Sequence, residues 1–287
     1  MGAPESAFNR SSLSVNWQIP VNHNHPLNKG LRAWYLCQPS FMGGTVLQDL
    51  VARKNGDLIN MDGSNWGFNS RLGGWGSIST NGTNEHVHLN HAPVADNAVD
   101  DNFSFCGWIR TANTAAGQYC LTESNTGSDQ PIFALINQSG EPRMFLRDME
   151  GGASATLTGV NIADGAWHFW QLSSKGGTAY LWVDGQHEAT LAYSSGAALG
   201  LNAASIGALH RTSVGSYAQV EVDDVRFYSR GLTFLEHQEL YRLSQQGYGG
   251  LLNRITHSRY SEAVVASGFQ PAWAMNVNTL YGGGLNV

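Results

Sequence analysis

The chain has 287 residues, 42% of them hydrophobic, so it is long enough to bury a sizeable core. Only 13% are charged, about half the usual share, and 34 are glycine, a composition typical of all-β proteins with many tight turns. The formal net charge is −6 without any basic run, which argues against nucleic-acid binding, and no apolar run is long enough for a transmembrane helix.

Short apolar segments separated by turn residues, the pattern of β-strands, fill most of the chain. Residues 1–30 are polar, and alternation at Trp17, Ile19 and Val21 is compatible with one edge strand. Beyond them we expect strands at residues 31–36, 45–50, 57–59, 77–79, 85–89, 103–109, 131–135, 143–147, 167–172, 178–183, 204–208 and 219–228. The turn Asn81-Gly82 predicts a hairpin between the strands on either side of it, because both residues tolerate a positive φ.

The strand expected at 103–109 has a strict two-residue period. One face carries Phe103, Phe105, Gly107 and Ile109, and the other Ser104, Cys106 and Trp108. Four tryptophans fall in expected strands, where their large area would fill the space between two sheets: Trp34, Trp108, Trp167 and Trp182.

One helix is expected late in the chain. Thr233 is a good N-cap, Glu236 completes a capping box, and Gly247 is a plausible stop. Its apolar stripe would consist of Leu235, Leu240 and Leu243. Many strands followed by a single short helix predict an all-β fold, a two-sheet antiparallel β-sandwich of the jelly-roll type.

Three segments are expected along the chain. Residues 1–30 would form an N-terminal arm, 31–248 the sandwich, and 249–287 a C-terminal extension. The extension contains an apolar stretch at 270–275, so we expect it to pack on the domain or on a partner.

The cysteines Cys37, Cys106 and Cys120 are odd in number and fit no metal-binding spacing. We expect buried free thiols, as in a protein made in a reducing cytoplasm. The first residues carry neither the basic nor the apolar segment of a secretory signal peptide, so we expect none.

Six segments in order resemble the laminin G-like and concanavalin A-like lectin family. They are 30–35 (GLRAWY), 46–58 (with VLQDL and NGDL), 103–109 (FSFCGWI), 164–168 (DGAWH), 180–185 (YLWVDG) and 222–233 (VDDVRFYSRGLT). Together they span about three quarters of the chain. The resemblance implies a jelly-roll sandwich and the pairing order of its strands.

The flanks resemble a narrower group, the laminin G-like proteins of phage structural gene regions. The similar segments are 26–31 (PLNKGL), 271–276 (PAWAMN) and the Gly282-Gly283-Gly284 ending. This resemblance implies a non-enzymatic structural protein of a virion, a capsid decoration or fibre-like component that binds other virion proteins and forms homo-oligomers. A glycan-binding lectin or adhesion module is the alternative, and a glycoside hydrolase a weaker one.

The hydrolase hypothesis requires a pair of carboxylates on one strand. Glucanases that the sandwich resembles carry the pattern E-x-D-x-x-E or E-x-D-x-E, and the nearest match begins at Glu221 and Asp223. The second glutamate is absent, because Val225 and Arg226 stand in its places. We therefore expect no catalytic residues.

The sequence contains candidate ligands for two kinds of metal site. Histidines that alternate on a strand point to one face, as His86 and His88 would, with His91 near, and His23 and His25 form a similar pair. No third ligand is evident, so surface or packing roles are favoured. A structural calcium is common in the family that the chain resembles, and Asp49 and Asp224 are its candidate ligands here.

Sugar binding usually needs an exposed aromatic ring beside amides and carboxylates. The aromatic residues in glycine-rich segments are Trp66, Trp75, Tyr119 and Tyr217. Core packing is favoured for each of them, so the sequence assigns no sugar site.

Overall fold

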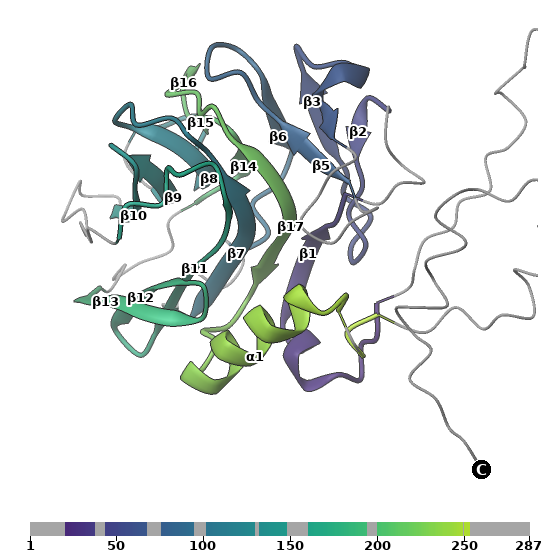
Figure 1. Cartoon of the computed structure of the whole chain (residues 1–287), viewed down its shortest axis with the longest axis vertical. Coiled ribbons are helices and arrows are strands. Elements are labelled where there is room, and N and C mark those ends of the chain that lie inside the picture. Colours follow the sequence, from purple (N-terminus) through teal and green to yellow (C-terminus); the bar gives the residue numbers. More distant parts are fainter. Residues whose placement is uncertain are drawn as a thin grey trace, which may run out of the picture.

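A computed structural model describes residues 21–37, 44–67, 76–94, 102–129, 132–147, 160–193, 200–248 and 250–252. Two antiparallel sheets face each other and form a sandwich (Figure 1). The jelly-roll prediction is confirmed. None of the helices in these ranges is long and apolar enough to cross a membrane.

The first sheet has eight strands, in the order β13-β12-β11-β7-β17-β5-β4, with β1 also paired to β17. Its strands are β1 (Leu31–Tyr35), β4 (Trp66–Gly67), β5 (Ser77–Ser79), β7 (Phe103–Arg110), β11 (Trp167–Lys175), β12 (Thr178–Val183), β13 (Gln186–Ala192) and β17 (Glu221–Tyr228). We call it the front sheet.

The second sheet, the back sheet, has seven strands in the order β10-β9-β8-β14-β6-β3-β2. They are β2 (Val46–Leu47), β3 (Gly56–Ile59), β6 (His86–Leu89), β8 (Gln118–Ser124), β9 (Ile132–Gln138), β10 (Glu141–Arg147) and β14 (Ala203–Ile206). A short hairpin of β15 (Leu209–His210) and β16 (Val214–Gly215) stands apart, and there are two 3-10 helices, η2 (Pro26–Asn28) and η4 (Gly63–Asn65).

The core between the sheets is built from the alternate faces that the sequence predicts. Phe103, Phe105 and Ile109 point into it from the front sheet, and Phe133 and Leu135 from the back sheet, all fully buried or nearly so. Phe103 stacks on Phe133 with 4.2 Å between ring centroids, which ties the two sheets together.

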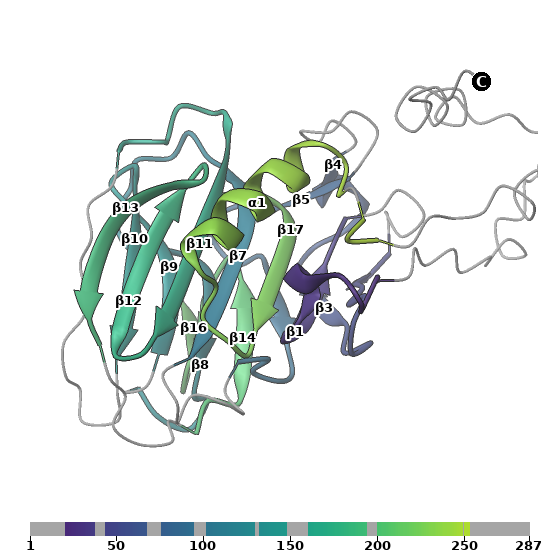
Figure 2. The ribbon, with the colours of Figure 1, turned by 90° about the horizontal axis from the view of Figure 1, so that it is seen from below.

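The helix α1 (Phe234–Gln245) crosses the outer face of the front sheet, over β11, β7 and β17 (Figure 2). Its predicted start is confirmed, because the Thr233 side chain accepts from the backbone N–H of Glu236 and the Glu236 carboxylate accepts from that of Thr233. The predicted stripe is only partly right: Leu240 and Leu243 are buried, whereas Leu235 is 74% exposed.

The four strand tryptophans do not fill the space between the sheets, and that prediction is wrong. Trp34 and Trp108 point to the outer face of the front sheet and pack in a second core beneath α1. Trp182 also meets the helix, stacked on His237 at 4.7 Å. The reason is that successive residues of a strand point to opposite faces. Trp108 shares the outer face with Cys106, whereas Phe105 points into the core between the sheets.

The expected hairpin around Asn81-Gly82 is also corrected. Its turn exists, and the Asn81 side chain accepts from the backbone N–H of Thr83 and Asn84. However, β5 belongs to the front sheet and β6 to the back sheet, so this turn carries the chain from one sheet to the other.

Candidate functional site

A polar groove of about 510 Å³ lies where β5, β7 and β17 of the front sheet meet the loops beside them. The residues that line it come from positions 79–85, 110–113, 165 and 219–221. They include Asn81, Glu85, Arg110, Asn113, Gln219 and Glu221. Amides, carboxylates and one guanidinium therefore line the same space.

An ion pair lines the groove at the end of the strands. Arg110, the last residue of β7, pairs with Glu221, the first residue of β17, and Ser77 donates to the same carboxylate. The Arg110 guanidinium also lies over the ring of Trp167, 5.3 Å from its centroid. The register of the strands places the three side chains in a row across the sheet, because Arg110 is opposite both Trp167 and Glu221.

Amide groups form one wall. The Asn113 side chain donates to the Gln219 side chain at 2.9 Å, and the Thr111 hydroxyl donates to the Gln219 backbone carbonyl at 2.9 Å. Glu85 also lines the groove, and its carboxylate accepts from the Asn65 amide at 2.8 Å. The groove therefore offers fixed amide and carboxylate groups of the kind that hydrogen-bond hydroxyls.

The carboxylates of β17 do not form a catalytic pair at this groove. Glu221 lines it, but Asp223 is fully buried, and its Oδ1 accepts from the backbone N–H of Cys37 at 3.1 Å and of Asp224 at 2.7 Å. A register shift between Asp223 and Arg226 then breaks the alternation of the strand. Of the two carboxylates, only Glu221 therefore lines the groove.

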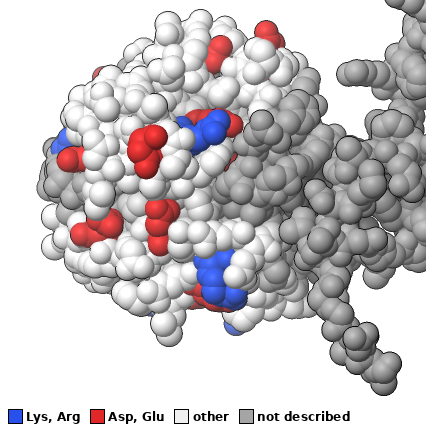
Figure 3. Space-filling model, in the orientation of Figure 1, with Lys and Arg blue, Asp and Glu red and all other residues white. Residues whose placement is uncertain are grey.

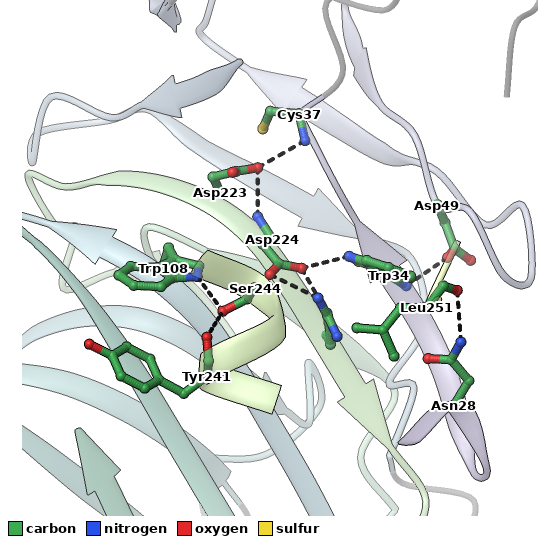
Figure 4. Close-up of polar contacts among 11 residues, drawn as sticks. Asn28, Trp34, Cys37, Asp49, Trp108, Asp223, Asp224, Tyr241, Ser244 and Leu251 are labelled. Carbon is green, nitrogen blue, oxygen red and sulfur yellow. Dashed lines mark hydrogen bonds and ion pairs between the residues drawn. The ribbon is translucent and has the colours of Figure 1, made fainter. Parts of the chain in front are cut away.

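The calcium candidates Asp49 and Asp224 lie on either side of Trp34 (Figure 4). Asp49 accepts four backbone N–H bonds, from Trp34, Val51, Ala52 and Lys54, at 2.9 to 3.2 Å. Asp224 accepts the Trp34 indole N–H at 2.7 Å and a two-pronged ion pair from Arg226.

These two carboxylates do not fit one calcium site, because each is directed at N–H donors and a guanidinium lies against Asp224. Calcium binding by the chain stays a prediction. Both residues have a structural role instead: they hold the backbone and ring of Trp34 at the base of the second core.

The alternating histidines do share the outer face of the back sheet. His88 meets a histidine that the sequence did not suggest, His210 of β15, with 2.8 Å between their Nδ1 atoms. His86 packs against Tyr217, and burial lowers its pKa to about 4. Of the other pair, His25 accepts from the backbone N–H of Leu27 and caps η2.

Of the candidate aromatic residues, Trp66 is 5% exposed and belongs to the core between the sheets. Tyr119 packs edge-on against Phe145, and Tyr217 against His86. Trp75 lies outside the described residues. None of the three described rings lines the groove.

The groove residues themselves were missed. Sequence reasoning considered Glu221 only as a catalytic residue and passed over Arg110, Asn113 and Gln219. These are separated by up to about a hundred positions, and only the pairing order of β7 and β17 brings them together. A local signal for them does not exist.

A second, smaller pocket of about 320 Å³ lies beside the start of α1. Trp182, Phe234 and Tyr180 line it together with Lys175 and His187. Phe234 remains 54% exposed, so this end of the helix presents an apolar edge to the pocket.

Acidic and basic groups are scattered over the face shown in Figure 3, without an extended patch of either sign.

The comparison of sequences with family models decides the family. The model described as "Concanavalin A-like lectin/glucanases superfamily" matches residues 81–236, more than half of the chain. The chain belongs to this superfamily. No curated protein matches it.

Solved structures of the superfamily fold that resemble this member include receptor-binding domains of botulinum neurotoxins. The binding domain of neurotoxin DC in complex with SialylT has a TM-score of 0.54 at 12% identity, over 76% of this chain and 52% of that chain. The receptor-binding domain of the C/D mosaic serotype has 0.57 at 13%, over 75% and 51%. The DC domain in complex with rat synaptotagmin II has 0.56 at 12%, over 76% and 52%.

This superfamily member thus spans about half the length of those binding domains. At such identity the likeness is one of fold. The shared fold is a jelly roll.

Proposed function

We propose that this protein is a non-enzymatic glycan-binding module and that the polar groove on the front sheet is its binding site. The observation that carries the proposal is the set of converging amides and carboxylates around a space of about 510 Å³. They are held by hydrogen bonds within the protein, so they are positioned before any ligand arrives. Membership of the concanavalin A-like lectin/glucanase superfamily supports this class of ligand.

The charges of the groove favour neutral glycans. Its lining contains two carboxylates, Glu85 and Glu221, and one guanidinium, Arg110, which Glu221 already neutralises. A sialylated or sulfated sugar would bring further negative charge beside Glu85, which costs free energy in a partly closed site. Neutral hydroxyls would instead meet both donors and acceptors.

The non-enzymatic part of the proposal rests on the lack of a working carboxylate pair. Glu221 is engaged by Arg110 and Ser77, and Asp223 is buried under backbone donors. Retaining and inverting hydrolysis both need two carboxyl groups on the two sides of one glycosidic bond. Robust hydrolysis of any glycan by the wild-type chain would overturn the non-enzymatic proposal, and activity that survives in Glu221→Gln and Asp223→Asn would show that it arises elsewhere than at this strand.

A glycan array probed with the full chain tests the binding proposal, with titration calorimetry on the best neutral hit. Asn113→Ala and Gln219→Ala should each weaken binding by roughly fivefold, the value of about one hydrogen bond of 1 kcal/mol. Gln186→Ala removes an exposed amide from β13, at the far edge of the same sheet, and should leave affinity unchanged. An array without hits, or equal losses in all three variants, overturns the proposal.

The second part of the proposal is that the module is carried on a virion, as a capsid decoration or fibre-like component. Its support is the resemblance of the flanks 1–30 and 249–287 to phage structural proteins. A structural observation favours joint action of the flanks: Val21 and Leu252 form an antiparallel bridge, so both leave the sandwich from one place.

Hydrogen bonds join the two chain segments at this place. The buried Asn28 donates to the backbone carbonyl of Leu251 at 2.9 Å (Figure 4) and to that of Asn22 at 2.9 Å. The backbone N–H of Asn22 also donates to the Leu251 carbonyl. Two flanks that start side by side can contact one surface together, which raises their effective concentration for each other.

Mass spectrometry of purified particles tests the virion proposal, and light scattering of the purified chain tests the homo-oligomer that we expect with it. The chain should be found in particles and should sediment with them. A chain that is absent from particles overturns the virion role but leaves the glycan proposal standing, because the groove lies outside the flanks.

A further inference from the structure

Two histidines from distant parts of the chain meet on the outer face of the back sheet. His88 lies in the middle of β6, and His210 ends β15, 122 positions later. Their Nδ1 atoms are 2.8 Å apart, and their ring centroids 4.4 Å. Both side chains are half-buried, so solvent can reach the pair.

We propose that His88 and His210 chelate one divalent transition-metal ion of the zinc class through their Nδ1 atoms, with water completing the coordination. Neutral imidazole is a preferred ligand of zinc, copper and nickel. Zn–N bonds of about 2.0 to 2.1 Å in tetrahedral geometry place two ligand nitrogens about 3.3 Å apart. The rings therefore need to separate by only about half an ångström to admit the ion.

The surroundings of the pair suit a metal that keeps water. Ser205 of β14 is directly opposite His88, and its buried hydroxyl has no hydrogen-bond partner among the described residues. Opposed side chains on antiparallel strands lie about 5 Å apart at Cβ, within reach of a metal-bound water. On the other side of His88, Asp57 of β3 is in register and adds negative charge to this face.

The site would have two protein ligands, since the described residues contain no group of three histidine, cysteine or acidic side chains with metal-binding geometry. Its physical effect would be a cross-link. The hairpin β15–β16 is held to β8 by hydrogen bonds from Thr122 to Ala208 and from Ser124 to His210. The metal would add a bond from this hairpin to β6.

Calorimetric titration of the metal-free full chain with zinc chloride tests the proposal, together with thermal melts with zinc and with a chelator. One ion per chain should bind, and zinc should raise the melting temperature. Loss of a partner that only supports a metal ligand costs about tenfold or more in affinity, so His88→Asn and His210→Asn should each cost at least that. His187→Asn, which removes an exposed histidine from the front sheet, should change nothing.

Thermal melts in the presence of chelator identify any variant that has lost its fold. In that case NMR of the wild-type chain gives the answer, because zinc should shift the ring resonances of His88 and His210 before those of other histidines. Zinc binding that survives in His88→Asn, shifts confined to other histidines, or a wild-type chain that binds no zinc overturns the proposal. Glycan binding at the groove is independent of all these outcomes.

Discussion

Asp224 and Arg226, two positions apart on β17, form an ion pair in which both side chains are fully buried. The guanidinium donates to both carboxylate oxygens, at 2.7 and 2.9 Å, and its plane lies over Trp34, 4.1 Å from the ring centroid. Asp224 adopts a positive φ of 56° at the point where the strand register shifts. Residues i and i+2 of a strand point to the same face, so the alternation of Val225 and Phe227 into the core between the sheets places Asp224 and Arg226 together on the opposite face.

Asp224→Asn should destabilise the fold strongly, by about 3 to 5 kcal/mol, because it leaves a buried guanidinium without its counter-charge. Urea unfolding followed by tryptophan fluorescence measures the change. Asp57→Asn, at an exposed position of the edge-side strand β3, is the control and should cost little. A cost below 1 kcal/mol for Asp224→Asn would show that water or relaxation compensates the buried charge.

Thr233→Ala should remove the N-cap of α1 and cost about 1 kcal/mol. The effect should be larger than that of an ordinary surface change, because the same helix covers the second core and the Glu236 carboxylate also receives Arg230 at 2.8 Å. Thr233→Ser keeps the hydroxyl and should retain most of the stability. Equal losses in both variants would argue against a capping role.

The fold could be predicted from the sequence where local signals are strong. The alternation of 103–109 and the capping box at Thr233 both lead to elements that the structure contains. Each of these signals acts over a few residues, where backbone geometry and side-chain period decide the result.

Strand β8 escaped prediction because it is buried and polar at once. Glu123 and Ser124 are fully buried, as is Thr122, and they are accommodated by partners that are distant in sequence. Glu123 accepts from the backbone N–H of Val94 at 2.7 Å, and Thr122 donates to Ala208 at 3.0 Å. A hydrophobic pattern cannot reveal a strand whose burial depends on such tertiary hydrogen bonds.

The groove was hidden for a related reason. Its amides lie in exposed loops that carry no motif, and they converge only because β17 lies between β7 and β5 in the sheet. Likewise His88 was noticed in the sequence, but its partner His210 could not be, because no local pattern links positions 122 residues apart. Sites built across a sheet need its strand order before they can be recognised.

His168→Gln should lower stability more at pH 5.5 than at pH 8.5. His168 binds Asp184 at 2.7 Å and Asp164 at 3.2 Å, and the hydrogen bond with Asp184 chiefly raises its pKa above the ordinary 6.5. A raised pKa in the folded state stabilises the fold fully below 6.5 and loses this effect as pH rises through the folded value. Unfolding free energies of both proteins at several pH values measure the difference, which should shrink toward alkaline pH.

A cost that is independent of pH would assign His168 a packing role only. Asp164→Asn offers a milder form of the same test, since Asp164 is the more distant and more exposed partner. It should reduce the pH dependence without abolishing it, because the contact with Asp184 remains.

His237→Gln should show the opposite slope. His237 is buried under α1, where it contacts the Ser173 hydroxyl at 2.9 Å and stacks on Trp182, and burial lowers its pKa to about 3. The unfolded chain therefore binds a proton between pH 6.5 and about 3 that the folded chain does not, so His237 destabilises the fold progressively as pH falls through this window. The variant should be less stable than the wild type at pH 7, because it loses the stacking, and the two should converge toward pH 4. Guanidinium unfolding at pH 7, 5.5 and 4 measures this difference in stability.

His187→Gln, which changes the exposed histidine on the other side of Trp182, is the matched control and should leave the slope unchanged. A difference that widens on acidification would contradict the assignment of a neutral, buried imidazole.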